Sequence, residues 1–121
     1  MKKVLLVEAD EAFRHEARGH LEYSGLFVEC AENAADAIRT GLVLRPELLI
    51  TGLHLAAGTT GVEVARSLAR QLDGLRIVFV VDHGEREELE TKLGTLEVAD
   101  VLFKPVSMSA LEECAMGPDA V

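Results

Sequence analysis

The sequence is poor in cysteine and in aromatic residues. Its 121 residues include two cysteines, Cys30 and Cys114, with one tyrosine, four phenylalanines and no tryptophan. Two cysteines are too few for a disulfide framework, and their separation matches no metal-ligand spacing. We therefore expect two free thiols, buried or half-buried, and a reducing, cytoplasmic setting.

The sequence is also short of positive charge and of long apolar segments. Lysine and arginine number 12 against 21 aspartates and glutamates, so the formal net charge is −9. Because this charge opposes the phosphates of nucleic acids and of anionic membranes, we expect the segment to bind neither. The first apolar run, residues 4–7, is far too short for a signal-peptide core or a membrane span, and no targeting segment is expected.

What is present is a regular alternation of short aliphatic runs with longer segments of helical periodicity. The length and the 49% hydrophobic content suit one domain, which we place at residues 1–116, with residues 117–121 as a tail or the start of a linker. Five rounds of alternation predict a flavodoxin-like, doubly wound α/β fold with five helices on both faces of a parallel sheet of order 2-1-3-4-5. The predicted strands are 4–7, 26–30, 48–51, 77–81 and 98–103.

Two of the predicted helices carry an apolar stripe. The segment Glu11–Tyr23 has an apolar residue at every fourth position, and the second helix is expected to bury Ala34, Ile38 and Leu42. Gly41 lies inside this second helix and predicts close packing against the sheet. Helix N-caps are expected at Asp10, Asn33 and Ser107.

Polar residues follow four of the predicted strands. In a doubly wound sheet, ligands bind outside the carboxyl ends of the strands, where the strand order reverses. Acidic side chains and a lysine are therefore expected to converge near one edge. The four strand-end segments are Glu8-Ala9-Asp10, Gly52-Leu53-His54, Asp82-His83 and Lys104-Pro105.

Three further segments fit the same layout. Pro46-Glu47 leads into the third strand, Gly61-Val62-Glu63 opens the third helix, and Val98-Ala99-Asp100 precedes the Lys104-Pro105 pair. With the strand-end residues, they make residues 3 to about 115 resemble the receiver domain of bacterial response regulators. In that family, two acids after the first strand and one after the third bind Mg²⁺, and the third-strand acid accepts a phosphoryl group. A hydroxyl residue and the lysine bind the phosphoryl oxygens, as phosphoryl transfer requires.

The resemblance implies a degenerate form of that domain. Glu8 and Lys104 match the family pattern, whereas a phosphoaspartate cannot form at a glycine. Mg²⁺ binding is expected to be weak or absent, so no cofactor is expected. The loop 53–61 is one residue longer than is usual in the family and could lie over the pocket. The departures at the second acid, the acceptor, the hydroxyl residue and the aromatic switch residue are Ala9, Gly52, Val81 and Val101.

We interpret the chain as a non-enzymatic pseudo-receiver, a phosphorylation-independent interaction module of two-component signal transduction. By resemblance, a protein partner or a second copy would bind the face of the fourth helix, fifth strand and fifth helix. An output domain could follow residue 121. Phe103 fits the core as well as this face, and we favour the core. The expected face includes Glu88, Lys92, Val101, Phe103 and Ser107.

Two alternative functions stay open at this point. Asp10 or Thr51 could accept a phosphoryl group in place of the missing acid. A bound ligand could instead be the signal. A metal could bind Glu8, Asp10 and His54, or a metal or small anion could bind Glu8, His54 and Lys104. The simpler interpretations are that Asp10 is a helix N-cap and that Lys104 forms an ion pair with Glu8.

Three more expectations concern local features. By resemblance to the family, the peptide bond between Lys104 and Pro105 is expected to be cis. His15 and His20 lie about 140° apart on their helix, so we expect them to be solvated rather than to share a metal. The acid-rich segment 85–90 is expected to form the exposed face of a helix.

Overall fold

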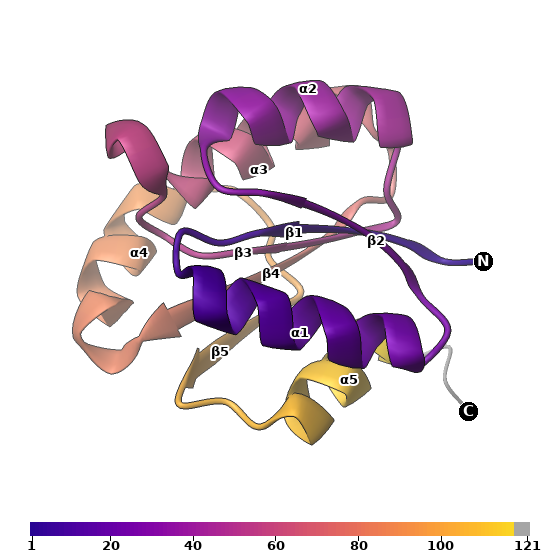
Figure 1. Cartoon of the computed structure of the whole chain (residues 1–121). Coiled ribbons are helices and arrows are strands. Elements are labelled where there is room, and N and C mark those ends of the chain that lie inside the picture. Colours follow the sequence, from indigo (N-terminus) through magenta and orange to yellow (C-terminus); the bar gives the residue numbers. More distant parts are fainter. Residues whose placement is uncertain (118–121) are drawn as a thin grey trace.

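The computed structural model describes residues 1–117, which form one parallel sheet covered by helices on both faces (Figure 1). The strand order is β2-β1-β3-β4-β5, as predicted. The strands are β1 (Lys3–Val7), β2 (Phe27–Ala31), β3 (Leu48–Thr51), β4 (Arg76–Asp82) and β5 (Asp100–Lys104). The α-helices are α1 (Glu11–Tyr23), α2 (Ala34–Leu44), α3 (Gly61–Gln71), α4 (Arg86–Leu93) and α5 (Met108–Met116), with short 3₁₀ turns η1 (Ala56–Gly58) and η2 (His83–Glu85).

The predicted strand boundaries agree with the structure to within two residues. The largest difference is at β5, which begins at Asp100 rather than at residue 98. The backbone N–H of Ala99 nevertheless donates to the carbonyl of Ile77 at 2.7 Å, so pairing with β4 starts just before the strand. Apart from Gly117, the predicted tail lies outside the described residues.

Two hydrophobic cores lie on opposite faces of the sheet. Leu5 and Val7 of β1 point into the core beneath α2, α3 and α4, whereas Val4 and Leu6 point into the core beneath α1 and α5. Strands that are apolar at successive positions are expected to be covered on both faces, and β1 shows why. None of the helices among residues 1–117 combines the length and apolar character needed to cross a membrane.

The predicted helix N-caps are confirmed. The side chains of Asp10, Asn33 and Ser107 each accept a hydrogen bond from the backbone N–H three residues further on. Such a cap satisfies one of the unpaired N–H groups at a helix start. The three caps fix where α1, α2 and α5 leave the carboxyl edge of the sheet.

The prediction for the buried face of α2 was wrong in part. Its buried residues are Ala34, Ala37 and Gly41, whereas Leu42 is 42% exposed. A Cβ at Gly41 would lie 2.8 Å from both δ carbons of Leu68 on α3. The glycine therefore lets α2 approach α3 closely. In this orientation the small residues of α2 face the core, and Leu42 faces outward.

Candidate functional site

The Glu8 carboxylate forms the centre of the candidate site, at the carboxyl edge of the sheet. Glu8 follows β1 and is 6% exposed. Its Oε1 lies 3.1 Å from Nζ of Lys104, and its Oε2 accepts a hydrogen bond from the N–H of Asp10 at 3.0 Å. The Lys104 ammonium also lies 4.5 Å from the centroid of the Phe13 ring. The predicted ion pair is thus present, and both oxygens of the carboxylate are engaged.

Gly52 lies directly beside this carboxylate, at the end of β3. A Cβ built on Gly52 would lie 3.5 Å from Oε1 and 3.7 Å from Oε2 of Glu8. The Gly52 carbonyl accepts a hydrogen bond from the hydroxyl of Thr51 at 2.9 Å. A Cβ at Gly61 would lie 1.9 Å from that same carbonyl oxygen. A carboxylate at position 52 would therefore meet the Glu8 carboxylate at close range.

The mouth of the site is a hollow of about 380 Å³. The Lys104–Pro105 peptide bond at its rim is cis, which confirms the prediction. Val81, at the position where the family has a hydroxyl residue, is 1% exposed and presents no polar atom, while the next residue, Asp82, is exposed. The hollow is lined by Asp10, Phe13, Glu16, Asp82, Lys104, Pro105 and Val106.

The two alternative phosphoryl acceptors differ in accessibility. Thr51 is fully buried, and its hydroxyl donates to the Gly52 carbonyl, so a phosphodonor cannot reach it without unfolding the strand end. Asp10 is exposed, and its Oδ1 accepts a hydrogen bond from the N–H of Phe13 at 3.2 Å. Of the two, only Asp10 is open to solvent.

His54 is not brought to the acids that the sequence suggested as metal ligands. Its Nε2 lies 2.8 Å from Oε1 of Glu88 on α4, and the other Glu88 oxygen lies 3.1 Å from Nζ of Lys92. The hydrogen bond from His54, followed by that from Lys92, holds the pKa of the Glu88 carboxyl below its usual value. Within residues 1–117, no three His, Cys, Asp or Glu side chains are grouped to hold a metal ion.

The loop between β3 and α3 does not line the hollow. The N–H of Ala56 donates to the carbonyl of Glu32 at 2.8 Å, and the N–H of Ala34 donates to the Thr59 hydroxyl at 3.0 Å. With the His54 contact to α4, these bonds tie the loop to the start of α2 on one side and to α4 on the other. The expectation that the longer loop could lie over the pocket is therefore wrong.

The expected partner face contains an aromatic stack that the sequence analysis missed. The ring of Phe103 stacks on the ring of His83, with centroids 4.6 Å apart and an interplanar angle of 8°. The guanidinium carbon of Arg86 lies 5.2 Å from the same Phe103 ring. Phe103 is half-buried and also packs against the core under α4, so both interpretations of this residue hold in part. Its neighbour on that side of β5, Val101, is half-buried as well.

The other three residues of the face lie on the two flanking helices. Glu88 and Lys92 form an ion pair on α4, and Ser107 is the N-cap of α5. In the acid-rich segment 85–90, Arg86, Glu87 and Glu90 are exposed and Glu85 and Glu88 are half-buried, so the expected exposed face is present in part. The buried Leu89 is its contact to the core. The five residues thus lie on α4, β5 and the start of α5.

The expectation for the two histidines of α1 was right for one of them. His15 is exposed, but Nε2 of His20 lies 2.8 Å from Oε2 of Glu112. This bond links α1 to α5 and, with a further hydrogen bond from Ser24, lowers the pKa of the Glu112 carboxyl. The sequence could not show this pairing, because it depends on how α1 and α5 pack side by side.

The two thiols are free and half-buried, as expected, and burial raises the pKa of each. Because the thiolate is the reactive form, we expect both to react with iodoacetamide more slowly than free cysteine at neutral pH. The rate should rise with pH as the thiolates form. Mass spectrometry of the modified peptides measures the rate of alkylation at each cysteine, with the protein unfolded in urea as the reference. A rate equal to that of the unfolded protein would contradict it.

The architecture and the acid–lysine pair at the carboxyl edge of the sheet define a CheY-like, flavodoxin-like α/β domain. The family model described as "Response regulator receiver domain" matches residues 4–115, and the chain belongs to this family.

Curated relatives include the KDP operon transcriptional regulatory protein KdpE of Escherichia coli K12, 31% identical over 93% of this chain and 48% of that protein. The sensor histidine kinase AruS of Pseudomonas aeruginosa is 32% identical over 90% of this chain and 11% of that protein. The acid tolerance regulatory protein ActR of Rhizobium meliloti is 29% identical over 86% of this chain and 53% of that protein. The chain thus spans about half or less of the length of these relatives.

Solved structures agree in fold. A two-component response regulator from Clostridium difficile superimposes with a TM-score of 0.84 at 18% identity, with 100% of both chains covered. The receiver domain of a modulated diguanylate cyclase from Desulfovibrio desulfuricans G20 gives 0.81 at 28% identity, with 92% of this chain and 87% of that chain covered.

Proposed function

We propose that this receiver domain acts in two-component signalling as a phosphorylation-independent protein-interaction module. The observation that carries the proposal is the Glu8 carboxylate, which lies against Gly52 and 3.1 Å from the Lys104 ammonium. The side chain that would carry a phosphoryl group is absent at position 52. The lysine that would bind the phosphoryl oxygens already has a carboxylate partner of opposite charge.

The charge balance inside the pocket supports this proposal. A phosphoryl group entering the site would have to displace Glu8 from Lys104 and leave a buried carboxylate without its partner, which is energetically costly. The second family acid is replaced by Ala9, so that carboxylate is missing beside Glu8, and the other acids of the site, Asp10, Glu16 and Asp82, line its mouth. The buried Glu8 carboxylate therefore already has its counter-charge, Lys104, without phosphate or metal.

The oxygen donors of the site do not fit Mg²⁺. This ion requires near-octahedral coordination by oxygen, yet Glu8 uses both of its oxygens within the protein and Asp10 caps α1. We therefore expect no rise in melting temperature on titration with Mg²⁺ or Mn²⁺, since a ligand that binds only the native state must raise it. A concentration-dependent rise that Glu8→Gln abolishes would contradict the proposed metal independence. A typical receiver domain titrated in parallel is the positive control.

The partner face supports a module with one fixed state. Val101 has no ring to rotate, and a β-branched side chain has a restricted χ1 angle. The ring on this face belongs instead to Phe103, which is stacked on His83 and approached by Arg86. We propose that a partner protein binds the α4–β5–α5 face in this arrangement, without a phosphorylation-dependent switch.

Amide NMR spectra test this proposal on the face itself. We expect the backbone signals of Val101 and Phe103 to stay in place when acetyl phosphate and Mg²⁺ are added, because neither acceptor nor switch is present. The same additions to a typical receiver domain should move the corresponding signals. Saturable shifts across α4, β5 and α5 of this chain would overturn the proposal.

Introducing the missing acid should not restore phosphorylation. In Gly52→Asp the new carboxylate would face Glu8, so we expect little phosphoryl labelling and a loss of about 1 kcal/mol in the free energy of unfolding from like-charge repulsion. Gly52→Ala is the matched control, because its Cβ makes ordinary contacts of 3.5 Å or more with Glu8. Efficient labelling of Gly52→Asp by acetyl phosphate would show that the pocket is functionally intact.

A further inference from the structure

The outer side of strand β2 is open for pairing with another strand. β2 lies at the edge of the sheet and, among residues 1–117, pairs only with β1. The N–H of Phe27 donates to the carbonyl of Lys2 at 2.9 Å, and the carbonyl of Ala31 accepts from the N–H of Glu8 at 3.1 Å. Because the backbone groups of alternate residues point to opposite sides of a strand, those of Val28 and Cys30 point away from the sheet.

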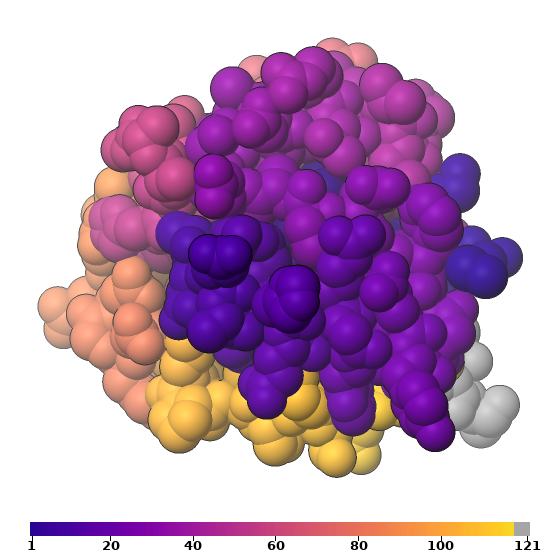
Figure 2. Space-filling view, in the orientation of Figure 1, coloured from indigo at the N-terminus to yellow at the C-terminus, as the bar shows by residue number. Residues whose placement is uncertain are grey.

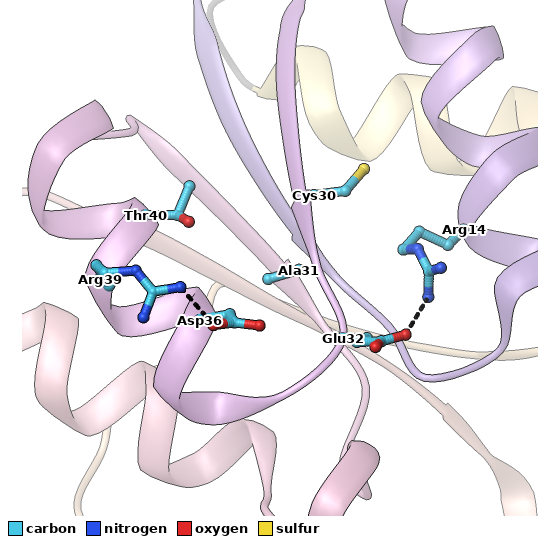
Figure 3. A pocket seen from close by; sticks show the side chains of 7 residues that line it. All are labelled: Arg14, Cys30, Ala31, Glu32, Asp36, Arg39 and Thr40. Carbon is cyan, nitrogen blue, oxygen red and sulfur yellow. Dashed lines mark hydrogen bonds and ion pairs between the residues drawn. The ribbon is translucent and has the colours of Figure 1, made fainter.

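A depression runs beside this edge along α2. One hollow, of about 420 Å³, is lined by Phe27, Glu29, Arg39, Thr40, Val43 and Leu44. The next, of about 470 Å³, is lined by Arg14, Cys30, Ala31, Glu32, Asp36, Arg39 and Thr40 (Figure 3). The two hollows share Arg39 and Thr40 and therefore adjoin. Figure 2 shows this side of the molecule, with α2 above and α1 below the edge of the sheet.

Apolar side chains are exposed at this edge. Phe27 is 44% exposed at the start of β2, and Val43 is 83% exposed in the last turn of α2. Edge strands are usually protected by charge, proline or a covering segment, because an open edge is a template for pairing. In β2 the only charged residue is Glu29.

We propose that β2 pairs with β2 of a second copy of this chain, antiparallel and about a two-fold axis through Glu29. Val28 then lies opposite Cys30 of the second copy, and the outward N–H and C=O groups of these two residues form reciprocal hydrogen bonds on each side of the axis. The five strands of each copy join into one continuous sheet.

The side chains of β2 are self-complementary in this register. On the α2 side, the bulky Phe27 lies opposite the small Ala31 of the second copy, which would cover the exposed ring. At the axis the two Glu29 carboxylates meet, and each copy brings Arg39, which lines the same hollow as its own Glu29. Each Arg39 also pairs with Asp36 of its own copy, so the two guanidinium groups offset the repulsion between the Glu29 carboxylates only in part. The match in size between the exposed Phe27 and the small Ala31 favours a second copy over an unrelated strand.

Sedimentation velocity at increasing protein concentration, with a matched pair of variants, tests the proposal. Cys30→Pro removes the outward N–H without breaking a bond to β1, whereas Cys30→Ala removes the thiol and keeps the N–H. We expect the original chain and Cys30→Ala to approach twice the monomer mass, and Cys30→Pro to stay monomeric with an unchanged circular dichroism spectrum. A dimer that persists in a folded Cys30→Pro would overturn the proposal. An original chain that stays monomeric at all concentrations would overturn it as well, and a segment of another protein would then be the remaining candidate to pair with β2.

Cross-linking tests the register without the proline. Glu29→Cys, with Cys30 and Cys114 changed to serine, would place two thiols opposite each other in a non-hydrogen-bonded pair. The Cα separation in such a pair, about 4.5 Å, is within the range of a disulfide. Mild oxidation should give a covalent dimer, whereas Phe27→Cys in the same background should not. Equal cross-linking of both variants would overturn the register. This dimer is independent of phosphorylation, so either proposal can fail without the other.

Discussion

Replacing Gly61 with alanine is expected to lower the free energy of unfolding by about 3 kcal/mol or more, the upper end for overpacking of a buried site. The new Cβ would lie 1.9 Å from the Gly52 carbonyl oxygen and 2.5 Å from Oγ1 of Thr51. Gly61 is buried, and its own N–H donates to the carbonyl of Leu53 at 2.8 Å, so α3 cannot move away without losing this bond. The clash involves backbone that no rotamer change can relieve.

Urea denaturation of Gly61→Ala and of Gly19→Ala measures this effect. Gly19 lies on the exposed side of α1, and a Cβ there meets nothing within 4 Å. Because alanine favours a helix over glycine by about 1 kcal/mol, Gly19→Ala should be neutral or slightly stabilising. Similar denaturation midpoints for the two variants would contradict the close approach of α3 to the end of β3.

Replacing Glu8 with alanine is expected to cost about 2–3 kcal/mol of stability. Removing one partner of a buried ion pair leaves the other charge uncompensated, which typically costs about 3–5 kcal/mol. The Lys104 side chain is 22% exposed, so water can partly solvate the stranded ammonium and reduce this penalty. The loss of the hydrogen bond from Asp10 to the carboxylate adds to it.

The double variant Glu8→Ala, Lys104→Met separates the effect of the unpaired charge on stability from the effect of the lost side-chain packing. If the pair accounts for the effect, the double variant should be more stable than Glu8→Ala alone, because no unpaired charge remains. Additive losses in urea denaturation would show that the two side chains are not coupled. That result would also weaken the proposal that Glu8 holds Lys104 away from phosphoryl chemistry.

Much of the fold could be predicted because local and global signals agree. The apolar strands, the helix caps at Asp10, Asn33 and Ser107 and the strand order all follow from periodicity and capping chemistry. The buried face of α2 could not, because the close approach of Gly41 to Leu68 is a tertiary contact. For the buried face of α2, an apolar residue at helical spacing, such as Leu42, was a weaker guide than a small residue, Gly41, that allows two helices to pack closely.

The candidate site was predictable in its members but not in its contacts. The strand-end rule identified Glu8, Gly52 and Lys104, and the Glu8–Lys104 pair followed from their charges. The partners of His54 and His20 were missed, because a glutamate on another helix is set by packing rather than by sequence spacing. The stack of His83 on Phe103 was missed for the same reason, although an aromatic residue next to Lys104 was a usable signal.

The central claim is that this pocket does not accept a phosphoryl group, and intact-mass measurement tests it most directly. The purified chain is incubated with acetyl phosphate and Mg²⁺, with a typical receiver domain treated in parallel as the positive control. We expect the control to gain one phosphoryl group and this chain to keep its mass, because Gly52 offers no acceptor and Glu8 pairs with Lys104. A stoichiometric phosphoryl increment on this chain would contradict the account, with the exposed Asp10 as the first residue to examine.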